Sequence, residues 1–216
     1  MHEAEITIRH YQQEDRPYVR DLAWDTALIG EPAAAFFNDK EILADFLTLY
    51  FTDYEPESCF VAESESRLVG YLLGAKDTAA LDRVAKWEIA PRLLVKSLAK
   101  GTFLKKKNVT FAFRLLASFF KGEFVMPGFY KEYPATLHIN LEKKFRNLGI
   151  GSKLMGLYLE YLTRQGIPGV YIPTMSDKAA SFFRKQGFNF LYRGYRSYFR
   201  HILHKDLPLY IYGKRL

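Results

Sequence analysis

This chain has little cysteine and no long apolar run. Its one cysteine, Cys59, cannot form an intramolecular disulfide and fits a reducing cytoplasm. Because Cys59 precedes the apolar residues 60–62, we interpret it as a buried small side chain and not as a nucleophile. No apolar stretch approaches the roughly 20 residues that a membrane span requires. Residues 1–5 lack the basic-then-apolar order of a signal peptide, so we expect a cytoplasmic protein with no membrane partner.

Several binding motifs are also missing. The five histidines show no metal-ligand spacing, so we expect no metal cofactor. No Gly-Lys-Ser/Thr follows a glycine turn at P-loop spacing, and G-x-G-x-x-G is absent. These absences exclude a P-loop nucleotide site and disfavour a dinucleotide fold.

What the chain does contain is an Arg-Asn-Leu-Gly-Ile-Gly turn between the apolar run 135–141 and a helical pattern over 150–165. Gly149 and Gly151 allow close approach of a ligand, and the N–H groups of a helix start favour an anion such as a diphosphate. Arg146 would add a charge-assisted hydrogen bond. An ordinary strand-to-helix turn remains the alternative. The residues expected to bind the cofactor here are Arg146, Asn147, Leu148, Gly149, Ile150, Gly151 and Ser152.

A second strand-turn-helix pattern follows. Residues 169–173 read as a short buried strand. Ser176 or Asp177 is positioned to cap the next helix, whose apolar face includes Ala179 and Phe183. Gly187 then supplies a C-terminal stop.

These two patterns together resemble the GNAT superfamily of N-acetyltransferases. Its signature is R/Q-x-x-G-x-G/A followed by N-x-x-A-x-x-x-Y-x-x-x-G-F. In this chain Ser176 stands at the Asn position, Ala179 at Ala and Phe183 at Tyr. The resemblance implies that acetyl-CoA binds as co-substrate, with its pyrophosphate on the glycine turn and with Ser176, Ala179 and Phe183 among the residues around it.

The stretches 26–30, 70–78 and 133–141 are similar to a subgroup that includes the acetyltransferase-like domain attached to O-GlcNAcase. The resemblance implies an α/β fold with a mixed central sheet splayed between its fourth and fifth strands. We expect one acetyltransferase domain over 1–216, with a helical insertion at about 79–133 between the third and fourth strands.

The pattern along the chain predicts the remaining elements. Strands are expected at 6–10, 58–63 and 67–76, and helices at 15–23, capped by Asp15, and 40–51, apolar at positions that include Phe46. Two C-terminal strands are expected within 188–212, joined around residues 205–208. The insertion has helical patterns at 79–100, with a break at Pro91, and at 109–121. It is either a lid over the acceptor pocket or a basic arm that forms a dimer surface.

The net charge of +7 is compatible with several kinds of anionic binding partner. It suits the phosphates of CoA, since Lys143, Lys144 and Lys153 flank the glycine turn. A nucleic-acid or membrane surface would also attract it. The aromatic and basic residues 192–201 fit strand alternation better than nucleic-acid binding, so nucleic acid is disfavoured as a partner.

The candidates for catalysis follow from the expected reaction, attack of an amine on the thioester. The resemblance places backbone groups of Ile139, Asn140 and Leu141 beside the acetyl and pantetheine parts. His138 is a candidate base, or else a half-buried strand residue; Asp77 and Glu88 are weaker candidates. Phe183 cannot donate a proton, so Tyr171 and Tyr192 are the candidates for the general acid.

We therefore predict transfer of an acetyl group from acetyl-CoA to an amine of a small molecule or peptide in a ternary complex. Two alternatives stay open. One is a CoA-binding but catalytically silent regulatory domain, suggested by Phe183 and Ser176. The other is a protein lysine or N-terminal acetyltransferase whose basic insertion recognises an acidic partner. A homodimer is possible through the aromatic C-terminal strands.

Overall fold

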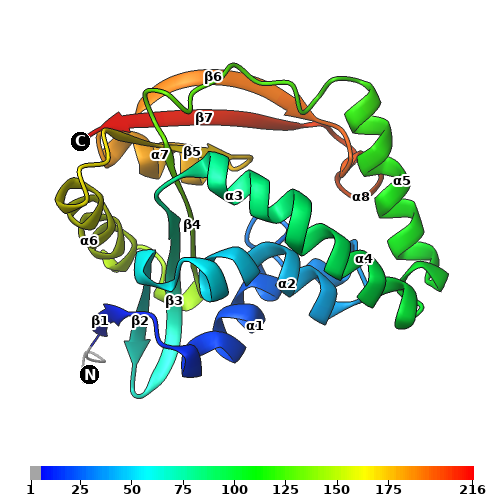
Figure 1. Ribbon diagram of the computed structural model, residues 1–216, viewed down its shortest axis with the longest axis horizontal. Coiled ribbons are helices and arrows are strands. Elements are labelled where there is room, and N and C mark those ends of the chain that lie inside the picture. Colours follow the sequence, from blue (N-terminus) through cyan, green and yellow to red (C-terminus); the bar gives the residue numbers. More distant parts are fainter. Residues whose placement is uncertain (1–5) are drawn as a thin grey trace.

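The computed structural model describes residues 6–216 and has the expected α/β architecture (Figure 1). Residues 1–5, on which the expectation about a signal peptide rests, lie outside this part. Within 6–216, seven strands form one mixed sheet in the order β1-β2-β3-β4-β5-β7-β6. No helix of this part is long and apolar enough to cross a membrane.

The first half of the sheet is antiparallel and follows the chain. Its strands are β1 (Ile6–His10), β2 (Cys59–Ser64), β3 (Arg67–Ala75) and β4 (Ala135–Leu141). β2 and β3 are the expected hairpin, and the insertion separates β3 from β4.

The second half begins with β5 (Gly169–Thr174), parallel to β4, and continues with β7 (Leu207–Arg215) and β6 (Asn189–Arg196). β4 and β5 are paired at Ala135 with Val170 and at Thr136 with Tyr171, and then they separate. In Figure 1, β4 runs down the view while β5 and β7 run across its top. The predicted splay between the fourth and fifth strands of the sheet is therefore confirmed.

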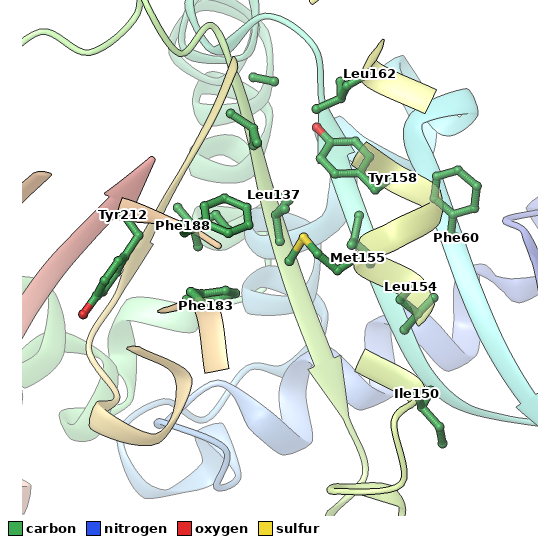
Figure 2. Close-up of a cluster of buried hydrophobic side chains, with 14 of the residues drawn as sticks. Phe60, Leu137, Ile150, Leu154, Met155, Tyr158, Leu162, Phe183, Phe188 and Tyr212 are labelled. Atoms are coloured by element: carbon green, nitrogen blue, oxygen red, sulfur yellow. The ribbon is translucent and has the colours of Figure 1, made fainter. Parts of the chain in front are cut away.

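One face of the sheet is covered by α6 (Ile150–Arg164) and α7 (Asp177–Lys185). Figure 2 shows Met155 of α6 beside Leu137 of β4, with Phe183 and Phe188 on the opposite side of Leu137. Met155 and Tyr158 of α6 are fully buried there. This packing fixes the start of α6 at the open end of β4.

The other face carries α1 (Arg16–Thr26) and α2 (Lys40–Leu49). Cys59 is buried on this side, and burial raises the pKa of its thiol to about 12, as expected for a structural cysteine. The capping role predicted for Asp15 is wrong, because its carboxylate pairs with Arg9 at 2.6 Å and accepts the Gln12 N–H at 2.8 Å. Phe46 is exposed, contrary to the prediction for α2.

The insertion consists of α3 (Thr78–Val84), α4 (Ala90–Ala99) and α5 (Lys106–Phe120). The break predicted at Pro91 is wrong, since a π-helical turn, Ala85–Ile89, joins α3 to α4. Pro91 occupies the first turn of α4, where its missing N–H matters least. α3 and α4 thus run as one long rod in Figure 1.

The C-terminal connection also differs from the prediction. β6 and β7 are joined through a short helix, α8 (Arg200–Leu203), and β7 already begins at Leu207. Shorter turns complete the chain. The 3-10 turns are Gln13–Asp15, Ala33–Ala35, Pro56–Ser58, Thr102–Leu104 and Lys143–Phe145, and a second π-helical turn is Tyr50–Tyr54.

Candidate active site

The turn between β4 and α6 leaves its helix start open. Gly149 precedes the helix at a φ of 78°, and Asn147 also has a positive φ, 66°. The first hydrogen bond runs from the N–H of Lys153 to the Gly149 carbonyl at 3.1 Å. The N–H groups of Ile150, Gly151 and Ser152 have no acceptor within residues 6–216. Three aligned donors and no acidic residue in the first turn are features that favour a bound anion.

The two glycines of the turn have different reasons for being glycine. A Cβ on Gly149 would meet no atom within 4 Å, so the positive φ is the constraint there. A Cβ on Gly151 would lie 3.4 Å from Phe182 and 3.6 Å from Leu141, which is ordinary contact. Gly149 therefore permits the left-handed backbone conformation of the turn, while Gly151 leaves the space next to its own Cα unoccupied.

Arg146 ties this turn to the loop after α1. Its Nε donates to the Leu141 carbonyl at 3.0 Å and its Nη2 to the Gly30 carbonyl at 3.4 Å. Gly30 itself has a φ of 88°, and a Cβ there would lie 3.1 Å from Arg146 Nη1. The guanidinium thus positions two loops around the turn. A cavity of about 650 Å³ lies beside it, lined among others by Thr26, Lys144 and Arg146.

The backbone of β4 faces the gap at alternate residues. The Glu142 N–H bonds the Val69 carbonyl at 2.9 Å, so in this antiparallel register even-numbered β4 residues bond to β3. The N–H groups of Ile139 and Leu141 consequently point to the side from which β5 has departed. Asn140, the third predicted residue, directs its backbone to β3 instead.

His138 and Asn140 meet on the α1 face of β4. Asn140 Nδ2 lies 2.8 Å from the Tyr71 hydroxyl and 3.3 Å from His138 Nε2, and His138 Nδ1 lies 3.5 Å from the same hydroxyl. Burial lowers the pKa of His138 to about 4, so the imidazole is neutral at pH 7.

The two candidate acids belong to a separate cluster. Tyr171 and Tyr192 pack with Phe129, Leu209 and Ile211 on the face of the sheet away from α7. Tyr171 is buried, and that burial raises the pKa of its phenol above the usual value. It lies beside Thr136, at the point where β4 and β5 part.

The second helix start has a side-chain cap on one of its N–H groups. Ser176 Oγ accepts the N–H of Ala179 at 3.3 Å, so Ser176, and not Asp177, supplies the cap. Gly187 ends the helix with a φ of 79°, as predicted. Phe183 is buried in the core beneath α7, 6.0 Å from the Phe188 ring, and Ala179 packs at its edge.

Sequence reasoning missed two tyrosines at this site. The Tyr158 hydroxyl lies 2.8 Å from the Thr136 carbonyl and 3.1 Å from that of Ala75, so it holds β3 and β4 where the splay starts. Tyr71 completes the contacts of His138 and Asn140. Both tyrosines stand at apolar positions of their elements, so the sequence pattern marks them as core residues and gives no polar signal.

Comparison with known proteins agrees with this geometry. Residues 122–188 match the model of the Acetyltransferase (GNAT) family. A structure entitled SsHAT shares 22% identity and a TM-score of 0.73, and the match covers 98% of each chain. The polyamine N-acetyltransferase of Drosophila melanogaster shares 15% identity and a TM-score of 0.59 over 98% of this chain and 100% of that one. The splayed sheet and the open helix start thus define the class: the chain has the GNAT acetyltransferase fold.

The chain is also similar in sequence to part of protein O-GlcNAcase. The proteins of Rattus norvegicus and Mus musculus are each 24% identical over 187 residues. The match covers 84% of this chain and 20% of theirs, so the chain spans about a fifth of the length of these curated relatives. yncA of Salmonella typhimurium, with acetyl-CoA bound, is a further structural neighbour at 13% identity and a TM-score of 0.56, covering 98% of this chain and 94% of that one.

Proposed function

We propose that this protein transfers an acetyl group from acetyl-CoA to the amine of a small molecule or peptide. The observation that carries the proposal is the open start of α6 at the end of β4, directly beside the gap that β5 leaves. One end of that gap suits a diphosphate, and the strand edge along it offers backbone donors to a thioester.

The residues have distinct roles in this proposal. The N–H groups of Ile150, Gly151 and Ser152 bind the pyrophosphate, with Asn147 and Leu148 forming the outside of the turn. The N–H of Ile139 or Leu141 donates to the thioester carbonyl and stabilises the oxyanion that forms there. Ala179 lies at the apolar edge of the site, and Phe183 supports it from the core beneath α7.

The transfer is a direct attack. The amine nitrogen forms a bond to the carbonyl carbon, the carbon–sulfur bond breaks, and CoA leaves as the thiolate. His138, neutral at pH 7, accepts the amine proton, while Tyr171 or Tyr192 donates a proton to the sulfur. Because His138 has a low pKa and Tyr171 a raised one, both are weak in these roles, and we expect a slow chemical step.

The acceptor pocket in this proposal comes from residues 24–37 and the insertion. These segments are in contact, since the Asn38 N–H donates to Asn108 Oδ1 at 2.7 Å and the rings of Phe36 and Phe111 lie 4.7 Å apart. The structural neighbours include a polyamine N-acetyltransferase and a ribosomal-protein-alanine N-acetyltransferase. A small amine and a peptide N-terminus are therefore both reasonable acceptors. We further propose that residues 1–216 form one domain that acts in the cytoplasm.

A catalytically silent CoA-binding domain is the second candidate. Phe183 favours it, because the family's tyrosine position holds a buried ring with no proton to donate. A protein acetyltransferase remains the third, supported by the basic insertion.

Calorimetric titration with acetyl-CoA tests the shared part of these proposals. We expect wild type to bind, and Gly149→Ala to bind about five- to thirtyfold more weakly, since alanine relaxes away from the positive φ in the free protein and binding must restore it at a cost of about 1–2 kcal/mol. Gly156→Ala is the matched control, because Gly156 lies exposed in the same helix, away from its start, and a Cβ there would meet no atom within 4 Å.

Release of free thiol with a panel of amines then separates an enzyme from a silent domain. A folded wild type that fails to bind acetyl-CoA refutes both. Binding without thiol release for any amine or acidic peptide refutes the enzyme and supports the silent domain.

A further inference from the structure

Helix α5 has apolar residues on two opposite faces. On its inner face Phe111 packs against the tilted ring of Phe36 at 4.7 Å and stacks on Phe199 at 5.8 Å. On its outer face Val109, Phe113, Leu116 and Phe120 follow at spacings of four, three and four, so they form one stripe along the helix. Phe113 is 66% exposed and Phe120 79%. A helix that is apolar all round is normally buried, so this outer stripe requires a cover.

The neighbouring part of the insertion also has exposed apolar residues. Leu94 and Leu98 of α4 are exposed, and Leu104, just before α5, is 90% exposed. Exposed apolar surface of this extent marks an interaction site. We call the exposed apolar residues of α4, α5 and their connection the outer face of the insertion.

The segment that carries the outer face has basic residues and no acidic ones. Residues 89–122 contain eight Lys and Arg and no Asp or Glu, so this segment alone exceeds the net charge of the chain, +7. Lys96 and Lys100 are paired with carboxylates of α2. Lys105 and Lys107 donate to the carbonyls of Asn38 and Ala34, which leaves their charge uncompensated.

Lys106 and Arg114 have no carboxylate within ion-pair distance in the described part of the chain. The outer face therefore combines exposed Phe and Leu with uncompensated basic charge. A binding partner of the outer face must therefore match both the apolar side chains and the basic charge.

Three occupants meet this requirement to different degrees. A second copy of the chain across a two-fold axis would bring the same basic segment against itself, which is repulsive. A nucleic acid satisfies the lysines but offers no apolar surface to a Phe and Leu stripe on the outside of a helix. The surface of an anionic bilayer accepts both, because phosphates meet Lys and Arg while Phe and Leu enter the acyl boundary.

We propose that the outer face of the insertion is a peripheral binding site for an anionic lipid surface, with α5 lying in the plane of the interface. The sequence-based expectation of no membrane partner rested on the missing spanning segment, and peripheral binding needs none. This binding is independent of acetyl transfer.

Co-sedimentation of the full chain with vesicles tests the proposal. We expect binding to vesicles of phosphatidylcholine with phosphatidylglycerol, little binding to phosphatidylcholine alone, and loss at high salt. Phe113→Ser should lower the partition coefficient roughly tenfold, and Lys106→Glu or Arg114→Glu roughly fivefold each. Phe46→Ser is the matched control, because Phe46 is also 66% exposed but lies on α2, in a segment (residues 41–57) that contains five Asp and Glu and no Lys or Arg.

Several outcomes overturn the proposal. They are no binding by a protein whose circular dichroism shows it folded, equal binding to both vesicles, and an equal loss in Phe46→Ser. A dimer that Phe113→Ser dissociates in ultracentrifugation would assign the face to a second copy, and salt-sensitive binding of duplex DNA or RNA without vesicle binding would assign it to nucleic acid. Unchanged acetyl-CoA affinity in Phe113→Ser separates this result from the proposed function.

Discussion

The units β4–α6 and β5–α7 both run from a central strand through a turn into a helix, on either side of the gap. α6 starts at Gly149 with three unpartnered N–H groups, whereas α7 starts at Ser176 with its cap in place and Asp177 in its first turn. The two units also differ in the polarity of the side chains that they present. β4 presents His138 and Asn140 as a polar contact, while β5 leads to Phe183 in the apolar core.

This difference shows that a strand-turn-helix arrangement does not itself make a ligand site. A helix start has the same backbone donors in every case, and the residue before it decides whether they are used internally. A side-chain oxygen such as that of Ser176 closes the site. A glycine with positive φ leaves it open and directs it at the gap.

We expect the largest effect from a side chain with an oxygen acceptor at the start of α6, where α7 already has one. In Gly149→Asp a carboxylate at the helix start would compete with the pyrophosphate for the same N–H groups and repel it. We expect acetyl-CoA affinity to fall by at least about a hundredfold, as the loss of two charge-assisted hydrogen bonds would produce. Titration calorimetry measures this. An Asp variant that binds like wild type would mean that the pyrophosphate lies elsewhere.

The next prediction concerns the buried polar contact on β4. His138 has a pKa of about 4 in the folded protein and about 6.5 when unfolded, so the unfolded chain binds more protons between these values. Stability should therefore fall as pH drops from about 6.5 to 4, by up to about 3 kcal/mol from this group. Urea unfolding across that range measures it. His138→Gln should lack this part of the slope, and an unchanged slope in the variant would contradict the prediction.

A third change gives α7 the phenol that the family usually has. Phe183→Tyr should raise the rate of thiol release by about tenfold or more if proton donation to sulfur limits the reaction. A buried hydroxyl without a partner should lower stability by about 1–3 kcal/mol. Turnover and thermal unfolding of the same sample separate the two effects. An unchanged rate would show that Tyr171, Tyr192 or water already supplies the proton.

We expect the smallest effect on stability and binding from removing the side-chain cap of α7. Ser176→Ala removes the cap and should cost about 1 kcal/mol of stability. Ser176→Asp keeps an acceptor and serves as the control. A loss of acetyl-CoA affinity in Ser176→Ala, with stability unchanged, would mean that the hydroxyl binds the cofactor and not the helix.

Much of the central fold could be predicted from sequence. The bounds of β4, β5, α6 and α7 came close to the prediction because short apolar strands, glycines and a cap residue mark them locally. The splay came from the resemblance alone, since no local pattern shows that two strands part after Thr136.

The sequence-based predictions that were wrong concern features that depend on tertiary contacts. Asp15 pairs with Arg9 of a neighbouring strand, and the rod through Pro91 depends on a π-helical turn that has no residue signature. Phe46 and the outer stripe of α5 fit an apolar helix pattern, but a pattern cannot say which of two apolar faces meets the core. For the same reason Tyr71 and Tyr158 could not be recognised as polar contacts at the splay.

The position of β7 has a consequence for the order in which the molecule folds. β7 follows β6 in the chain yet lies between β5 and β6 in the sheet, whereas β1 to β4 are added side by side. The β1–β4 half can therefore assemble progressively, but β5 keeps an unpaired edge until residues 207–215 arrive. On a ribosome, one wall of the gap would remain an exposed strand edge until the C-terminal segment emerged. A nascent chain stalled before β7 should accordingly be prone to aggregation and lack the completed gap.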